Sequence, residues 1–132
     1  MALDSRSRGY PQTFETFGAF ISRKRREKGM TLQMMSAQLG IAFSYLSDIE
    51  HDRRLPPEER LPRMAAVLGL SGADEAVFYD LAAHSRDAAP ADLADYLMCH
   101  PSARSAVRYA RDNDIDDSTW EEVLDFFQCN DE

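Results

Sequence analysis

The chain has 132 residues, of which 44% are hydrophobic, and a formal net charge of −8 at pH 7. This length suits one domain with a modest core, or a small domain with an appendage, and the apolar content excludes wholesale disorder. No apolar run approaches the roughly 18 residues of a membrane span, no signal-peptide core follows Met1, and two cysteines do not make a disulfide framework. We therefore expect a cytoplasmic protein that does not span a membrane.

The charge is unevenly distributed along the chain. Residues 1–63 carry a net charge of +3, and residues 64–132 carry −11. A phosphate backbone would be attracted to the first half and repelled by the second. The acidic total therefore does not exclude a nucleic-acid partner.

The first half of the chain predicts helices in close succession. Residues 1–12 have no hydrophobic period and are expected to form a flexible arm. From Thr13 the apolar residues recur at helical spacing, and Gly29 should end this first helix. Thr31 is the expected N-cap of a second helix, which should end at Gly40.

The third to fifth helices follow at once. The third should end before Pro56-Pro57, which cannot continue it. The fourth is expected after Pro57 and up to Gly69, and the fifth is capped by Ser71 with Asp74. The inward positions predicted for the five helices are Phe14, Phe17, Ile21, Leu32, Met35, Leu39, Leu46, Ile49, Leu61, Met64, Ala65, Leu68, Val77, Phe78, Leu81 and Ala82.

Beyond residue 86 the pattern predicts about three shorter helices. The first has Pro90 in its first turn, the second runs from Ser102 to about Arg111, and the third follows a capping box at 118–121. The last helix is expected to bury Trp120, Val123, Leu124 and Phe127. No segment alternates with period two, so the fold class is all-α: a five-helix domain at 13–86, then an acidic helical extension at 87–132.

The segment from Leu32 to His51 has the spacing of a helix-turn-helix, because two helices of about two turns each are joined by a tight turn. Ser36 would lie where the two helices approach most closely, which requires a small side chain. Gly40 would supply the positive φ of the turn. The outward positions on the second of these helices are Ala42, Phe43, Ser44, Ser47 and Asp48.

Two stretches, Thr31-Leu32-Gln33-Met34-Met35-Ser36-Ala37-Gln38-Leu39-Gly40-Ile41 and Ser44-Tyr45-Leu46-Ser47-Asp48-Ile49-Glu50, resemble the DNA-binding domains of the Cro/phage-repressor-like (XRE) family. The similarity covers about residues 14–70, a little under half of the chain. Three positions depart from the family pattern: Leu32 replaces a frequent phosphate-contacting Gln, Ala42 replaces a Ser or Thr cap, and Asp52 replaces a turn Gly.

The resemblance implies a five-helix phage-repressor-like domain whose third helix, at residues 42–51, enters the major groove. Phe43 would then pack on an apolar base edge such as a thymine methyl group. Ser44 and Ser47 could donate or accept hydrogen bonds, and Asp48 could accept one from a cytosine amino group. Phe43 could alternatively contact a partner subunit, because exposed aromatic residues often mark interfaces.

Phosphate contacts are expected on both sides of these base-reading residues. Thr31 and Gln33 begin the second helix, where free N–H groups favour an anion. Tyr45, Arg53 and Arg54 flank the third helix. Arg23, Lys24 and Arg26, on the outer face of the first helix, either add to these contacts or only solvate that helix, and Arg6 and Arg8 form either a DNA-reaching arm or an inert tail.

Arg25 falls on the core-facing stripe of the first helix, four residues after Ile21. A charge at this position needs a partner, and Glu50, four residues after Leu46, is the candidate. The family resemblance implies the same buried ion pair. We assign this pair to structure rather than to DNA binding.

The remaining signals for chemistry are weak. Residues 112–116 alternate like the start of an EF-hand loop, but Asp117 stands where the loop needs Gly and Val123 where it needs a bidentate Glu. Four zinc-type side chains lack the paired spacing of a zinc site: His84, Cys99, His100 and Cys129. We expect no metal, no cofactor and no enzymatic activity.

Two functions are compatible with these features. The first is a sequence-specific DNA-binding transcriptional regulator, a repressor that binds double-stranded DNA as a homodimer. The alternative is an antitoxin or adaptor whose acidic C-terminal helices bind a protein partner, with DNA binding secondary.

Overall fold

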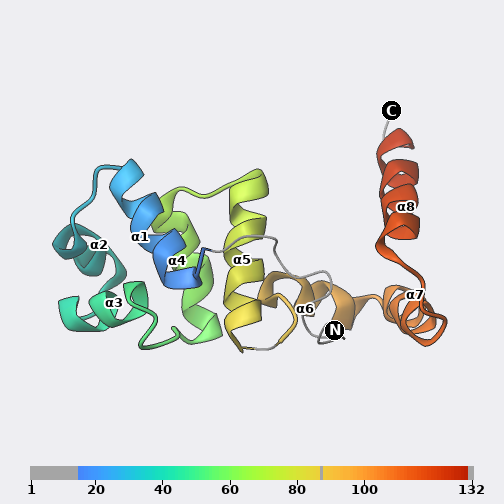
Figure 1. Ribbon diagram of the computed structural model, residues 1–132, viewed down its shortest axis with the longest axis horizontal. Helices are drawn as coiled ribbons and strands as arrows, with labels where there is room; N and C mark the ends of the chain where they lie inside the picture. Colours follow the sequence, from blue (N-terminus) through green and yellow to red (C-terminus); the bar gives the residue numbers. More distant parts are fainter. Residues whose placement is uncertain (1–14, 87, 131–132) are drawn as a thin grey trace, which may run out of the picture. The chain divides into compact units, whose positions relative to one another are not determined.

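The computed structural model describes residues 15–86 and 88–130, and every regular element within these ranges is a helix (Figure 1). The prediction of an all-α fold is therefore confirmed. The chain divides into two compact units between Asp92 and Leu93. No helix of the described ranges is long and apolar enough to cross a membrane.

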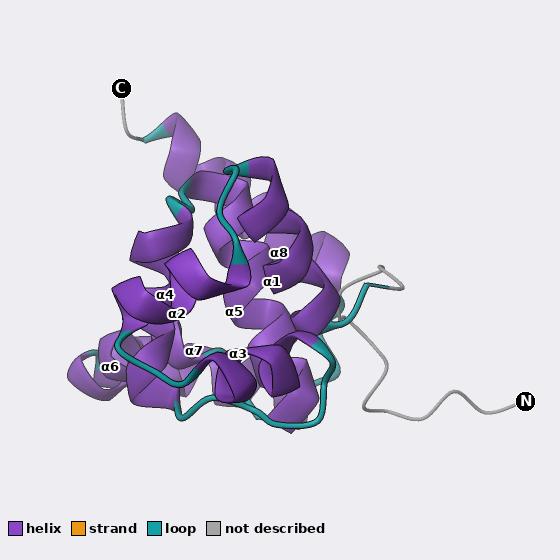
Figure 2. Cartoon of the chain, turned by 90° about the vertical axis from the view of Figure 1, so that its left-hand side faces the viewer, coloured by secondary structure: helices purple, strands orange, loops and turns teal. Residues whose placement is uncertain are grey.

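In the part of the first unit that the structure describes up to Arg86, five α-helices surround a common core (Figure 1 and Figure 2). They are α1 (Phe17–Glu27), α2 (Leu32–Leu39), α3 (Phe43–Glu50), α4 (Leu61–Leu68) and α5 (Gly72–Arg86), and a single 3-10 turn, η2 (Glu58–Arg60), leads into α4. Helices α2 and α3 pack against each other, and α1 contacts α3 and α5. Helix α3 is thus held from two sides by the body of the unit.

The beginning of α1 corrects the expected start at Thr13. Thr16 has extended backbone angles (φ −81°, ψ 166°), and its hydroxyl accepts a hydrogen bond from the backbone N–H of Ala19 at 3.1 Å. This cap places the first helical residue at Phe17. The predicted inward residue Phe14 and the predicted arm at 1–12 lie outside the described residues.

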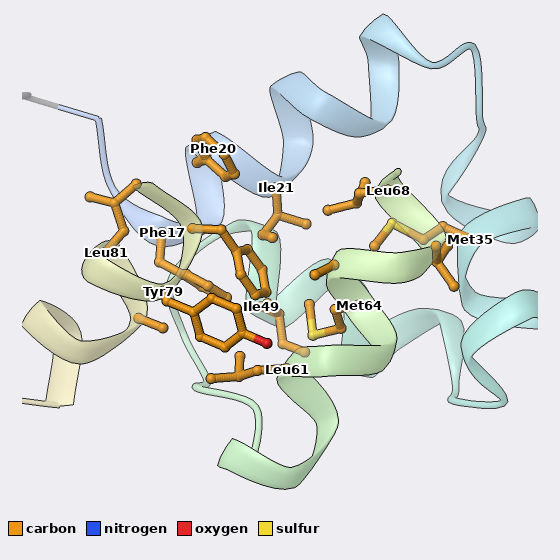
Figure 3. Packing of buried hydrophobic residues seen from close by; sticks show 14 of the residues in the cluster. Phe17, Phe20, Ile21, Met35, Ile49, Leu61, Met64, Leu68, Tyr79 and Leu81 are labelled. Carbon is orange, nitrogen blue, oxygen red and sulfur yellow. The ribbon is translucent and has the colours of Figure 1, made fainter. Parts of the chain in front are cut away.

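The core of the first unit is built around Phe78 of α5, which is fully buried. Figure 3 shows Phe17, Phe20 and Leu81 among the side chains of this core. The ring of Phe78 lies 5.4 Å from that of Phe17 and 6.4 Å from that of Phe20, centroid to centroid. Other buried side chains come from every helix of the unit: Ile21, Met35, Leu46, Ile49, Leu61, Met64, Leu68 and Leu81. Burial of this apolar surface is the main force that fixes α3 on the domain.

The second unit contains α7 (Pro101–Asp112), α8 (Asp117–Cys129) and most of α6 (Ala91–Cys99). Arg104 ends α6 by donating from Nη1 to the carbonyl oxygens of Leu97 and Met98, each at 2.6 Å. Pro101 occupies the first turn of α7, where its missing N–H costs nothing. These local interactions shape the helix pair.

The cap of α8 and the burial of its apolar face differ from the sequence prediction. The N-cap is Asp116, whose carboxylate accepts from the backbone N–H of Thr119 at 3.2 Å, so Ser118 already lies inside the helix. Leu124 and Phe127, expected to be buried, are 54% and 63% exposed. Among the described residues of this unit, only Ala110 is buried. The unit therefore has little core of its own.

Candidate nucleic-acid interface

The turn between α2 and α3 has the geometry of a helix-turn-helix. Thr31 caps α2 by accepting from the N–H of Met34 at 3.0 Å, and Gly40 ends the helix at φ +68°. Nothing lies within 4 Å of a Cβ added at Gly40, so the positive φ alone explains this glycine. Ser36 is buried, and its hydroxyl donates to the carbonyl of Gln33 at 3.0 Å. The turn thus depends on the Thr31 cap, the left-handed Gly40 and the small Ser36, all of which were predicted from the sequence.

Helix α3 buries one side and presents the other to solvent. Leu46, Ile49 and Glu50 are buried on the inner side. On the outer side Phe43 is 49% exposed, Ser44 is exposed, and Ser47 and Asp48 are half-buried. Ala42 stands at the N-cap without a side-chain hydrogen bond, which leaves N–H groups at this end of α3 free to meet an acceptor. The four side chains predicted to read bases thus lie along an accessible helix.

Arg25 and Glu50 form a buried ion pair that joins α1 to the end of α3. Arg25 Nε lies 2.7 Å from Glu50 Oε2 and Nη2 lies 3.1 Å from Oε1, with the two side chains only 8% and 3% exposed. Arg25 Nη1 also donates to the carbonyl of Met30 at 2.8 Å. The fork geometry satisfies both groups and fixes the orientation of α3 relative to α1.

A second connection joins α1 to the turn after α3 through Asp52, and it was not predicted from the sequence. Asp52 has φ +60°, and its carboxylate accepts from the N–H of Gly18 at 2.9 Å and from the hydroxyl of Thr16 at 2.5 Å. A Cβ at Gly18 would lie only 2.5 Å from the carbonyl oxygen of Ile49. The residue that replaces the usual turn glycine therefore caps α1, and Gly18 permits this close approach.

An open groove of about 520 Å³ runs beside α3. Ser44, Tyr45 and Asp48 of α3 line one part of it, and Arg54 and Arg60, from the segment after α3, line another. The guanidinium of Arg54 lies 5.4 Å from the ring centroid of Tyr45. Arg60 was not among the predicted site residues, since its position between Pro57 and α4 gave no sign that it would face α3.

The predicted phosphate-contacting residues are divided between two places. Thr31 and Gln33 lie at the exposed start of α2. Arg53 and Arg54 follow α3 and are 65% and 60% exposed, and Tyr45 is half-buried beside Arg54. Both groups of residues belong to the first unit, as α3 does.

Some cations on the outer face of α1 are engaged by carboxylates. Arg23 Nε lies 2.7 Å from Glu15 Oε2, and Lys24 Nζ lies 2.9 Å from Asp74 Oδ2. The hydrogen bond from Arg23 lowers the pKa of the Glu15 carboxyl, and the hydrogen bond to Asp74 raises the pKa of the Lys24 ammonium. This pairing favours a role in solvating and tying α1 over direct phosphate contact.

The described residues offer no obvious alternative chemistry. No group of three or more His, Cys, Asp or Glu side chains among them is arranged to hold a metal ion. Cys99 and Cys129 are exposed free thiols.

The arrangement of α2, the Gly40 turn and α3 defines a helix-turn-helix protein. The chain belongs to the helix-turn-helix family, whose model matches residues 21–74. It is 43% identical over 53 residues to the ImmF control region 10 kDa protein of Bacillus phage phi105, a match that covers 40% of this chain and 59% of the phage protein. It is 41% identical over 54 residues to an uncharacterized HTH-type transcriptional regulator of Sinorhizobium fredii (strain NBRC 101917 / NGR234), covering 41% of this chain and 70% of that protein.

Among solved structures, the chain is similar to one titled SinR protein/SinI protein complex. The alignment covers 88% of this chain and 98% of that chain, at 24% sequence identity and a TM-score of 0.41.

Proposed function

We propose that this protein is a sequence-specific DNA-binding transcriptional regulator that acts as a repressor in the cytoplasm. The observation that carries the proposal is the placement of helix α3. The Arg25–Glu50 ion pair and the hydrogen bond from Gly18 to Asp52 hold the end of this helix on α1, while the outer side of α3 stays accessible. Its family and the named regulator among its relatives support the same role. The function is binding, and no catalytic role is proposed.

In this proposal α3 lies in the major groove and Phe43, Ser44, Ser47 and Asp48 face base edges. Phe43 would select a thymine methyl group, and the two serines would accept or donate hydrogen bonds. No Arg or Lys on this side of α3 is placed to grip a guanine. Specificity therefore comes from modest contacts per half-site, supplemented by DNA shape and by pairing of half-sites.

Phosphate contacts position the domain on the duplex. Thr31 and Gln33 meet one strand at the start of α2, where backbone N–H groups add to the attraction. Arg54 and Tyr45, which line the groove beside α3, meet the other side together with Arg53. The proposed footprint thus straddles the reading helix.

We further propose that the protein binds DNA as a homodimer through its second unit. Helix-turn-helix regulators commonly bind two half-sites with two-fold symmetry. Among its described residues the second unit buries only Ala110, yet α6 to α8 expose many large apolar side chains, and exposed apolar surface of this kind often marks an interface. These exposed side chains are Leu93, Tyr96, Met98, Val107, Tyr109, Leu124, Phe126 and Phe127. A second copy would cover them.

One observation favours a second candidate function, that of an antitoxin or adaptor. The second unit, residues 93–132, carries a net charge of −7, which suits a basic protein partner better than DNA. In this alternative the second unit binds that partner and DNA binding is secondary. A stoichiometric complex with a basic partner that persists without DNA would support it.

Selection of bound sequences from a random duplex pool, followed by a salt titration, tests the leading proposal. We expect one enriched motif with two half-sites, and a logarithm of the binding constant that falls linearly with the logarithm of salt concentration. Absence of duplex binding at low salt, or enrichment of no motif, would contradict the proposal.

A further inference from the structure

Asp48 stands out on the accessible side of α3 because it places a negative charge where DNA is expected. Its Oδ1 lies 3.4 Å from Arg53 Nη1, and its Oδ2 lies 3.7 Å from Arg54 Nε. One carboxylate thus holds the two cations that follow the reading helix. The other acidic residue of α3, Glu50, is buried and engaged by Arg25.

These two ion pairs are suited to release. Arg53 and Arg54 are 65% and 60% exposed and Asp48 is 33% exposed, so water and salt screen the attraction. Exposed pairs of this kind contribute little to stability. The second support of Arg54 is the ring of Tyr45, at 5.4 Å from the guanidinium. A phosphate group can therefore draw both arginines away without disturbing the fold.

The release leaves the Asp48 carboxylate unpaired beside a polyanion. On an arbitrary sequence nothing compensates for this, because non-specific binding consists almost entirely of phosphate contacts. On a sequence that presents a cytosine amino group at the right position, the carboxylate accepts a hydrogen bond from that group, which replaces the lost ion pairs. The Asp48 side chain thus lowers the affinity for other DNA sequences more than it lowers the affinity for the operator.

From this geometry, and resting on the proposed function, we infer that Asp48 is a specificity-determining residue that restrains Arg53 and Arg54 and so suppresses binding to non-operator DNA. In the free protein it neutralises half of the charge that these two arginines would offer to phosphate. Its role is exerted through the arginines as well as through any base contact. Asp48 therefore acts as an electrostatic restraint on the reading helix.

The test compares Asp48→Asn with the wild-type full chain by fluorescence anisotropy, on a random duplex and on the selected duplex. Removing the carboxylate frees about one additional phosphate contact, so the salt slope on random DNA should steepen by about 0.9. At 0.1 M salt the affinity for random DNA should rise roughly five- to tenfold, since one added contact scales with that slope. The affinity for the selected duplex should stay equal or fall, so the specificity ratio drops.

Two further variants separate a restraint from a simple change of net charge. Asp74→Asn removes the same charge at the start of α5, which lies at the opposite end of the unit from α3 (Figure 1), and leaves Lys24 paired with Glu27 at 3.4 Å. It should leave the affinity for random DNA within about twofold of wild type, because salt screens charges beyond roughly 10 Å. In an Arg53→Gln/Arg54→Gln background, the gain from Asp48→Asn should shrink to the level of Asp74→Asn.

The outcomes are distinguishable. If Asp48→Asn binds random DNA no more tightly than wild type, or if its full gain persists without the two arginines, the restraint is overturned while the proposed function stands. If wild type binds no duplex at low salt, both the proposed function and the role of Asp48 as a restraint are contradicted. Unchanged melting temperatures across the variants ensure that the comparison reports binding.

Discussion

The guanidinium of Arg25 lies in the interior of the first unit, and its charge is tolerated because Glu50 and a backbone carbonyl satisfy its donors. Replacing Arg25 with Ala would strand the Glu50 carboxylate away from water. We expect this change to lower the free energy of unfolding by about 3–5 kcal/mol, measured by urea denaturation. The paired replacement Arg25→Met/Glu50→Leu should recover most of the loss, because no charge is then stranded. An Arg25→Ala protein as stable as wild type would contradict the structural role of the pair.

Asp80 on α5 is expected to make the stability of the first unit depend on pH. Although Asp80 is an exposed residue, desolvation of its carboxyl by the surrounding protein, and then the charge of Asp92, raise its pKa above the usual 3.8. Because the folded state raises this pKa, the stability from Asp80 is fully present below pH 3.8 and is lost as the pH rises through the folded pKa. Asp80→Asn should therefore raise the melting temperature at pH 7 and lose this advantage in acid. A variant that melts below wild type at pH 7 would contradict the assignment.

At the scale of elements, α1 and the end of α3 are in direct backbone contact at Gly18. A methyl group there would meet the carbonyl oxygens of Ile49 and Glu50 at 2.5 and 2.6 Å. We expect Gly18→Ala to cost about 1–3 kcal/mol by denaturation, and to weaken DNA binding because α3 must shift. Ser22→Ala, one turn further along α1, is the control and should leave both properties near wild type. If Gly18→Ala had the stability and the DNA affinity of wild type, the close contact between α1 and the end of α3 would not require a glycine, and the prediction would be wrong.

The elements that could be predicted from the sequence are those set by local chemistry. Thr31 and Gly40 delimit α2 because a hydroxyl cap and a left-handed glycine act within a few residues. The start of α8 was misplaced since both Asp116 and Ser118 are suitable caps, and only the structure distinguishes them. Pairing of Asp52 with Gly18 could not be predicted, because these residues lie 34 positions apart and no periodicity links them.

The same distinction holds for the site. The outward residues of α3 follow from helical periodicity, and Arg25 with Glu50 follows from the rule that a charge on a core-facing stripe needs a partner. Arg60 beside the groove depends on how η2 turns the chain into α4. The engagement of Asp48 by the arginines depends on side-chain positions beyond the end of the helix, which helical periodicity does not describe.

At the scale of the whole molecule, a compact unit with a net charge of −1 is linked to an acidic unit with exposed apolar helices. If these helices pair with a second copy, Leu124→Asp/Phe127→Asp should give a monomer in sedimentation velocity at micromolar concentration, whereas wild type sediments as a dimer. The first unit should keep its melting transition, because its core uses neither residue. The variant should also lose affinity for a two-half-site duplex while retaining weak binding to one half-site. A wild-type chain that sediments as a strict monomer without DNA would contradict the dimer.

The central claim is that α3 is the surface that meets DNA, and NMR chemical-shift mapping of the labelled full chain against a selected duplex tests it most directly. We expect the largest amide perturbations at Phe43 to Asp48 and at Arg53 and Arg54, with smaller ones at the start of α2. Perturbations confined to α7 and α8, with α3 unchanged at saturation, would contradict the account.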